Sequence, residues 1–417
     1  MRLERGIATN RGNIVPIGHS RHTGAGFAAI DRATAEIEPS FAVIDLGALR
    51  HNAKDMVRRA GGKPIRVASK SVRCRALLRY LLDNDGFAGI LAYTLREALW
   101  LGHEYSDIVV GYPTGDREAL RELAASRNLA SRITIMVDSL EHLEFIASAI
   151  EQPAHSIRVC LDIDASYQLA GGRLYFGVRR SIVRTPDQAY DLARAVDTRR
   201  GFLLVGVMCY EAQIAGLGDN TPGSALARAC IRAIQHRSGR ELRKRRAVVV
   251  SAIEAVTKLE FVNGGGTGSL ERTASEPVIT ELAAGSGLYG PTLFDNYRAF
   301  QPCPAAFFAL SVVRRASPTI VTVAGGGWIA SGGAGRDRLP TPTWPPGLRL
   351  TSLEGAGEVQ TPVAGPAAAD LHVGDRVWFR HAKAGELCER VESLHIVDGD
   401  TVVATVPTYR GEGKTFG

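Results

Sequence analysis

Residues 64–82, PIRVASKSVRCRALLRYLL, contain in one stretch the pattern that decides the fold. A short apolar run ends in the polar turn SKS, and the residues after the turn repeat apolar side chains at the spacing of a helix. A strand, a turn and an amphipathic helix in this order make a βα unit, from which parallel sheets are built. The stretch therefore predicts a βα unit whose buried strand ends at Lys70.

The same unit returns along residues 40–300. Its strands begin in turn with PIRVASKS, GFAGILAYT, DIVVGYPTG, RITIMVDS, SIRVCLDID, GFLLVGVMCYE, LEFVNGGGTGS and VITELAAGSG. About eight such units match a TIM-like (β/α)8 barrel. A doubly wound open sheet is the competing arrangement, but it does not need this many parallel units.

The pattern of alternating strands and helices ends near residue 300. The segments AFFALSVVRR, PTIVTVAGG, LHVGDRVWFR, ESLHIVDGD and TVVATVPTY have β character and are separated by glycine- and proline-rich turns. We therefore expect an α/β protein in three parts. These are an irregular N-terminal extension (1–38) that packs on the β domain, a barrel (39–300) and a C-terminal all-β domain (301–417).

Composition excludes several classes of protein. The chain of 417 residues is 45% hydrophobic and 22% charged, as in ordinary globular proteins. No apolar run approaches the ~20 residues that a membrane helix needs, and the N-terminus lacks a signal-peptide pattern. The six scattered cysteines favour reduced thiols over a disulfide framework. We expect a cytoplasmic protein without a membrane partner.

The net charge of +7 raises the question of nucleic acid. The most basic run, RELRKRR (Arg240 to Arg246), lies in a long helical pattern and is explained by a solvated helix face. Neither interleaved aromatic residues nor a zinc-finger spacing accompanies it. The sequence therefore predicts no nucleic-acid partner.

In a (β/α)8 barrel the chemistry lies where the strands end. Here the first strand ends at Lys70, the sixth at Tyr210 and Glu211, and the last two run into NGGGTGS (263–269) and AGSG (284–287). Glycine-rich backbone after the last strands can bring several N–H groups to a phosphate. Hydroxyl groups of Thr267, Ser269 and Ser286 can add donors.

Lys70 stands at a buried strand end beside this predicted phosphate site. A neutral lysine amine there can form an imine with an aldehyde, and the cofactor that combines an aldehyde with a phosphate is pyridoxal 5'-phosphate. The alternative is that Lys70 pairs with a carboxylate at the barrel mouth, such as Asp138 or Asp162. The residue pattern leaves both open.

Four motifs together resemble the fold-type III pyridoxal-phosphate enzymes, which carry the alanine racemase N-terminal barrel. They are the strand-ending lysine, GVMCYEAQ (206–213), VNGGGTGS (262–269) and GSGLYGP (285–291). Within these enzymes the chain is similar to the D-threonine aldolase/D-serine dehydratase group, whose metal-loop region residues 373–400 also resemble. The resemblance runs from about residue 40 to the C-terminus.

The resemblance implies roles for individual residues. Lys70 would be the Schiff-base lysine and a catalytic base, and Tyr210 would lie against the cofactor ring near its pyridine nitrogen. Arg173 would reach the ring, with Arg179 behind it, although the spacing here departs from the family pattern. Gln213 replaces a common histidine. The implied phosphate ligands are Gly266, Thr267, Gly268, Ser269, Ser286 and Gly287.

The implied metal site is altered. The group has His-x-Cys or His-x-Asp, whereas here His381 is followed by Lys383, whose ammonium cannot ligate a cation. Either Glu386 or Cys388 joins His381 around a divalent Mn, Zn or Mg ion, which requires a bend at Gly385, or no metal is bound. We expect Lys383 to take the place of the cation, so that His381 and Lys383 both act in catalysis.

The resemblance implies a pyridoxal-phosphate-dependent lyase acting on a D- or β-hydroxy-amino acid, by retro-aldol cleavage or by dehydration with deamination. It also implies a homodimer whose active sites are shared between one barrel and the other chain's β domain. A racemase or epimerase is an alternative, with Tyr409 as the candidate second base. A non-enzymatic pyridoxal-phosphate-binding protein is another, but such proteins are usually a bare barrel.

Overall fold

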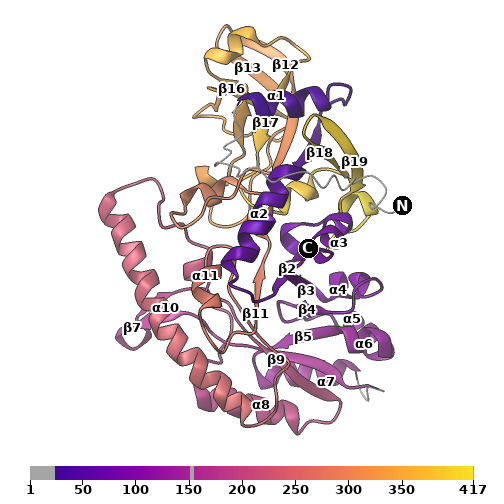
Figure 1. The fold of residues 1–417 in the computed structure, drawn as a ribbon, viewed down its shortest axis with the longest axis vertical. Helices are drawn as coiled ribbons and strands as arrows, with labels where there is room; N and C mark the ends of the chain where they lie inside the picture. The colour runs from indigo at the N-terminus through magenta and orange to yellow at the C-terminus, as the bar shows by residue number, and fades with distance from the viewer. Residues whose placement is uncertain (1–23, 151–154, 417) are drawn as a thin grey trace. The chain divides into compact units, whose positions relative to one another are not determined.

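The computed structural model describes residues 24–150 and 155–416, and the chain forms two compact units (Figure 1). The barrel unit comprises Asp55–Lys70 and Tyr80–Gly285, joined by Phe416 near the C-terminus. The described residues of the β unit are 24–54, 71–79 and 286–415.

Eight parallel strands among the described residues close the barrel in the order β10-β11-β2-β3-β4-β5-β6-β9, and β9 pairs with β10. They are β2 (Ile65–Ala68), β3 (Phe87–Ala92), β4 (Ile108–Val110), β5 (Ile133–Val137), β6 (Ile157–Asp162), β9 (Phe202–Cys209), β10 (Phe261–Gly264) and β11 (Glu281–Ala284). Each begins in one of the eight predicted units. The predicted (β/α)8 barrel is confirmed.

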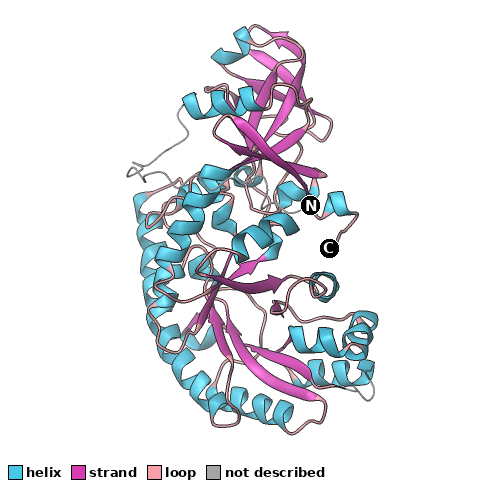
Figure 2. Cartoon of the chain, turned by 45° about the vertical axis from the view of Figure 1, so that its right-hand side comes forward, coloured by secondary structure: helices cyan, strands magenta, loops and turns pink. Residues whose placement is uncertain are grey.

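Helices follow these strands and lie outside them in Figure 2. They are α3 (Arg75–Leu82), α4 (Leu95–Leu101), α5 (Arg117–Ala125), α6 (Arg127–Arg132), α7 (Leu140–Ile150), α8 (Pro186–Asp197), α9 (Ala212–Ala215), α10 (Ala225–Glu254) and α11 (Leu270–Ala274). Local sequence starts several of them. Asp116, for example, accepts the N–H groups of Glu118 and Ala119 at the start of α5. No helix of the described residues has the length and apolarity to span a bilayer.

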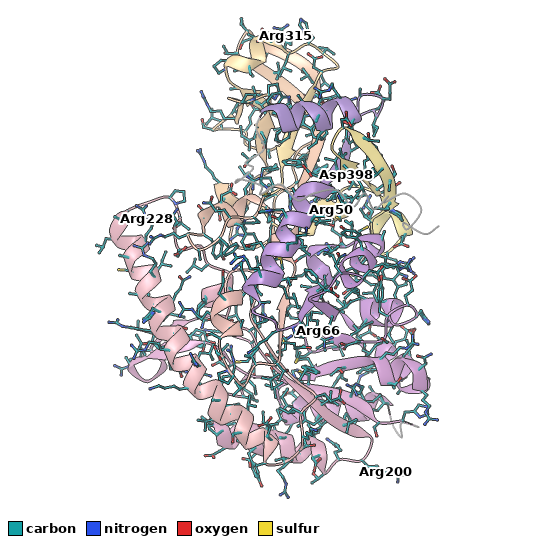
Figure 3. The ribbon with its side chains drawn as sticks, in the orientation of Figure 1. Arg50, Arg66, Arg200, Arg228, Arg315 and Asp398 are labelled. Atoms are coloured by element: carbon teal, nitrogen blue, oxygen red, sulfur yellow. The ribbon has the colours of Figure 1, made fainter. Side chains whose placement is uncertain are left out.

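The barrel interior is packed. One cluster contains Met136, Val205, Met208 and Phe261 together with Val109 and Cys160. A Cβ atom at Gly206 would come within 2.2 Å of the Phe261 ring, so only glycine admits that ring. Among the side chains labelled in Figure 3, Arg66 on β2 is buried and forms ion pairs of 2.7 Å with Glu281 and with Asp107.

Part of the basic run on α10 forms ion pairs inside the protein. Arg245 donates to Glu241 at 2.7 Å, and Arg246 is buried against Glu211 at 2.8 Å. These two side chains are therefore bound inside the protein, and the predicted solvated helix face does not include them.

The β unit is built on a sheet that, in the described residues, has nine strands in the order β15-β16-β13-β12-β1-β18-β19, with β17 pairing β12 and β14. They are β1 (Phe41–Asp45), β12 (Ala306–Ser317), β13 (Ile320–Ala324), β14 (Thr341–Trp344), β15 (Arg349–Leu350), β16 (Gln360–Ala364), β17 (Arg376–Arg380), β18 (Ser393–Asp398) and β19 (Thr401–Pro407). The β character expected after residue 300 is confirmed.

The N-terminal strand β1 joins this sheet. It pairs antiparallel with β12 and parallel with β18, so the predicted boundary at residue 39 falls before a strand whose partners belong to the β unit. Helix α2 (Leu46–Arg59) follows, and its Arg50 reaches Asp398 of β18 at 2.9 Å (Figure 3).

Part of the predicted N-terminal extension forms a helix. Residues 1–23 lie outside the described residues, but Gly24–Ala33 is the helix α1. Its Phe27 and Ile30 are buried against Phe41 and Trp378 of the sheet, and Trp378 donates to Asp31 at 2.9 Å. Irregular structure was predicted here because residues 1–38 are rich in glycine, arginine and histidine, and for Gly24–Ala33 that prediction is wrong.

Candidate active site

Lys70 lies at the carboxyl end of β2, in a single 3-10 turn formed by Ser69–Ser71. Its Nζ atom is 2.9 Å from the hydroxyl of Tyr112 and 5.4 Å from the centre of that ring. Tyr112 follows β4, two strands along the barrel. Because parallel strands present their carboxyl ends at one rim, the amine and the phenol meet at the mouth of the barrel.

The carboxylates that were the alternative partners of Lys70 have other neighbours. Asp138 Oδ1 lies 2.9 Å from His142 Nδ1. Asp162 is buried at the end of β6, where burial and the adjacent Asp138 raise its pKa to about 7, against the opposing effect of Arg180. A carboxyl group with this pKa can give or take a proton near neutral pH.

Arg180 links the two tyrosines of the rim. Its guanidinium lies 5.2 Å from the ring centre of Tyr112 and 5.6 Å from that of Tyr210. Arg173, expected to reach the cofactor, is instead exposed beside the short hairpin of β7 (Tyr167–Leu169) and β8 (Leu174–Phe176), and Arg179 stacks on Tyr175 at 4.3 Å. The position of Arg180 was not predicted from the sequence. The signal was the Gly171–Gly172 turn, which places Arg173 at a hairpin tip.

Tyr210 directly follows β9. Burial of its phenol, with the adjacent Glu211 carboxylate, raises the Tyr210 pKa to about 12, so the group stays protonated at neutral pH. A Cβ atom at Gly266 would lie 3.1 Å from the Tyr210 ring and 2.9 Å from Ala215 Cβ. Glycine at this position therefore lets the loop after β10 approach the tyrosine.

The glycine-rich loop after β10 keeps a defined conformation. Gly265 has a φ of +83°, which favours glycine. Ser269 and Thr267 are buried, and the Thr267 carbonyl accepts Arg59 at 2.7 Å. Ser269 Oγ donates to Glu211 at 2.7 Å and accepts the Gly266 N–H at 3.2 Å. The Ser269 hydroxyl thus already donates its proton to a side chain of the protein.

Gln213, which stands where the resemblance implies a histidine, is also engaged. Its amide donates to the Ala165 carbonyl at 2.7 Å and to Ser238 Oγ at 2.9 Å. The side chain therefore acts as a buried connector between the loop after β6 and α10.

The other predicted residues belong to the β unit. Ser286 and Gly287 form a 3-10 turn with Leu288 directly after the end of β11 in sequence, and Ser286 Oγ lies 3.1 Å from Ser71 Oγ. Tyr409, the candidate second base of a racemase, is 1% exposed.

His381 follows β17 and is 4% exposed, and neither of its ring nitrogens has a hydrogen-bond partner among the described residues. Burial, together with the positive charge of Arg380, lowers its pKa to about 3. The imidazole is therefore neutral. Lys383 Nζ donates to Ser331 Oγ at 2.7 Å.

The two residues expected to complete a metal site with His381 have other contacts. The backbone does turn at Gly385, with a φ of +87°. The Glu386 carboxylate nevertheless accepts the Ser331 N–H at 2.9 Å, and Cys388 Sγ donates to the Val72 carbonyl at 3.3 Å. Across residues 24–150 and 155–416 no group of three or more histidine, cysteine or acidic side chains is arranged to hold a metal. The metal that the resemblance implies does not fit these side chains.

Pyridoxal phosphate does fit the barrel rim. The amine of Lys70 suits an aldehyde and the ring of Tyr210 suits an aromatic ring. The loop after β10, where a Cβ atom at Gly266 would lie 2.9 Å from Ala215, offers close approach of backbone to a phosphate. These groups come from the ends of β2, β9 and β10 of one closed barrel.

Sequence comparison defines the class of protein. The family described as "Alanine racemase, N-terminal domain" matches residues 44–292, and the chain belongs to this family. This confirms the predicted relationship to fold-type III enzymes.

Individual relatives are more distant. The chain is 23% identical over 267 residues to a 3-hydroxy-D-aspartate aldolase of Paracoccus denitrificans, and the match spans 60% of each chain. It is similar in structure to D-threonine aldolase from Filomicrobium marinum, with a TM-score of 0.72, 21% identity and coverage of 90% of this chain and 96% of the other. D-threo-3-hydroxyaspartate dehydratase from Delftia sp. HT23 gives a TM-score of 0.71 at 19% identity, covering 89% and 97%.

Proposed function

We propose that the chain is a pyridoxal-phosphate-dependent lyase of a D- or β-hydroxy-amino acid, acting by retro-aldol cleavage or by dehydration and deamination. The observation that carries this proposal is the Lys70 amine at the barrel rim, 2.9 Å from Tyr112, in the barrel whose glycine-rich loop packs against Tyr210. Relatives named as aldolases and dehydratases of D-threonine and 3-hydroxyaspartate support the substrate class.

Each side chain of the rim has a part in holding the cofactor. Lys70 would bind its aldehyde, Tyr210 would lie against its ring, and Arg180 would supply positive charge beside both rim tyrosines. The residues assigned to the phosphate are Gly266, Thr267, Gly268, Ser286 and Gly287. Ser269 would hold this loop through its hydrogen bonds to Glu211 and Gly266.

The cofactor, when bound, withdraws electrons from the substrate Cα and so makes its bonds easier to break. In dehydration Lys70 Nζ would take the proton from Cα, whereas in retro-aldol cleavage it would give a proton to Cα after the Cα–Cβ bond has broken; in both the Tyr112 hydroxyl orients that amine. Removal of the Cα proton leads to loss of the β-hydroxyl, whereas removal of the hydroxyl proton leads to cleavage of Cα–Cβ. We favour the second outcome, an aldolase.

A product assay tests this function. The chain reconstituted with pyridoxal phosphate is incubated with D-threonine or 3-hydroxy-D-aspartate, with the L-enantiomers as controls. We expect glycine with acetaldehyde or glyoxylate. Ammonia with 2-oxobutanoate or oxaloacetate would indicate the dehydratase instead. A protein that stays colourless with added cofactor would contradict the whole proposal.

The buried position of Tyr409 favours a lyase over a racemase, since a second base must reach the substrate. Incubating one enantiomer in heavy water distinguishes the two, because a racemase yields the α-deuterated antipode. The non-enzymatic carrier is disfavoured by the β unit, which the similarity to the D-threonine aldolase chain includes.

We expect a cytoplasmic homodimer with shared sites, in agreement with the resemblance and with the free cysteines. Mixing Lys70→Ala chains with Lys383→Ala chains should then restore about one quarter of wild-type activity, because half of the dimers are mixed and each has one intact site. A fully active monomer in sedimentation would contradict shared sites.

A further inference from the structure

Glu211 is the most densely hydrogen-bonded side chain near the glycine-rich loop. It directly follows Tyr210 and is 1% exposed. Its Oε1 atom accepts Ser269 Oγ at 2.7 Å and also the hydroxyl of Thr273, and its Oε2 atom accepts Arg246 at 2.8 Å and the Gly265 N–H at 3.3 Å. Each carboxylate oxygen therefore accepts two hydrogen bonds from the protein.

The donors to Glu211 come from both ends of the loop. Gly265 opens it after β10, Ser269 closes it, and Thr273 lies one turn further on in α11. Between them the Gly266 N–H donates to Ser269 Oγ. Ser269 therefore links the Glu211 carboxylate to the middle of the loop. Hydrogen bonds to the Glu211 carboxylate thus fix the conformation of the loop in addition to its own backbone contacts.

Arg246 holds the Glu211 carboxylate in place through an ion pair of 2.8 Å. It is also 1% exposed, and it donates to Glu276 at 2.6 Å and to the Cys209 carbonyl at 3.0 Å. A buried guanidinium needs such partners, and Glu276 remains one of them if Glu211 is changed. The pair connects the ends of β9 and β10 to the long helix α10.

We infer that the buried Glu211–Arg246 pair preorganises the glycine-rich loop for the phosphate of the cofactor, and that Ser269 is a strut of this loop. The inference rests on the proposed function, because it names how that site recognises a phosphate. Glu211 and Arg246 are positioning residues and do not touch the ligand. A carboxylate next to a phosphate would repel it, and here the guanidinium of Arg246, 2.8 Å away, offsets the charge of Glu211.

The test compares two ligands that differ only in the phosphate, pyridoxal 5'-phosphate and pyridoxal, by absorbance titration of the apoprotein. Wild-type protein should prefer pyridoxal phosphate. Glu211→Gln should lose about 10- to 100-fold in affinity for pyridoxal phosphate, the usual effect of losing a hydrogen bond to a charged group, while its affinity for pyridoxal stays within about twofold. A general loss of stability would weaken both ligands equally, and that result would overturn the inference.

Thr273→Val provides a second variant that keeps the shape of the side chain and removes only its hydroxyl donor. We expect the same selective loss, smaller than for Glu211→Gln. In a double-mutant cycle Ser269→Ala and Glu211→Gln should not add, since both break one network. Additive losses would mark Ser269 as a direct phosphate ligand and contradict its role as a strut.

Glu281→Gln is the matched control. It breaks another buried ion pair of the same barrel, with Arg66 at 2.7 Å, while the oxygen of the new amide can still accept the Asn263 side chain, which Glu281 accepts at 2.8 Å on β10. Its melting temperature should fall while the preference for pyridoxal phosphate over pyridoxal remains that of the wild type. A wild-type protein that binds neither ligand would reject the proposed function, whereas binding with an unchanged preference in Glu211→Gln would reject only this inference.

Discussion

Replacing Lys70 with alanine is expected to abolish covalent cofactor binding and to lower activity by about a thousandfold or more, since it removes both the amine that binds the aldehyde and a proton-transfer group. Lys70 ends β2 at the barrel rim, where its amine contacts Tyr112 at 2.9 Å. After treatment with borohydride, peptide mapping of the wild type should find the cofactor attached at Lys70. The variant should carry no attached cofactor.

The fold should survive this change. The hydrogen bond lost to Tyr112 is worth about 1 kcal/mol, a small part of the stability of a packed barrel. Lys244→Ala on the exposed face of α10 is the control, and it should keep both the adduct and the activity. An adduct in Lys70→Ala that maps to another lysine would show that the assignment is wrong.

The sequence predicted the parts of this site that depend on strand ends. Lys70 and Tyr210 are adjacent to apolar runs, and the carboxyl end of each run in a parallel barrel must lie on one rim. The same reasoning located the glycine-rich loop after β10. The local sequence is sufficient here because the residue that follows each strand in the chain also lies at that strand's end in space.

What the sequence could not predict depends on contacts between distant segments. Glu211 meets Arg246 35 residues away and Thr273 62 residues away, and no periodicity relates them. Arg180 was missed because the β7–β8 hairpin lengthens the chain between the strand end and the arginine. Strand β1 precedes an amphipathic helix just as a barrel strand does, yet its partners are β12 and β18.

The second large effect on activity is expected at Lys383, in the altered metal site. His381 is neutral, with a pKa of about 3, so it contributes no positive charge near neutral pH. Lys383, two residues on, supplies an ammonium held by Ser331 at 2.7 Å. The relatives include a dehydratase of which a cysteine variant is described as a metal-free form, which makes metal use a property to test here.

We expect Lys383 to stabilise the negative charge that develops on the substrate hydroxyl or carboxylate. Lys383→Ala should lower kcat/KM about 100-fold, the typical effect of removing one such donor, and Cys388→Ala should cost less. A chelator should change the activity of the wild type by less than about twofold. Complete inactivation by the chelator, reversed by manganese or zinc, would contradict this.

The reverse substitution at position 383 tests whether the lysine ammonium excludes a metal. Lys383→Cys recreates the His-x-Cys pair, and both ring nitrogens of His381 lack a hydrogen-bond partner among the described residues. A thiolate and a neutral imidazole are zinc ligands, whereas an ammonium is not. The variant should therefore gain zinc, measured by elemental analysis after dialysis, and its activity should become sensitive to chelators. Lys383→Ser is the control, since it removes the ammonium without adding a thiolate, and it should bind no zinc. Equal zinc in the wild type and in Lys383→Cys would show that the ammonium does not exclude the metal.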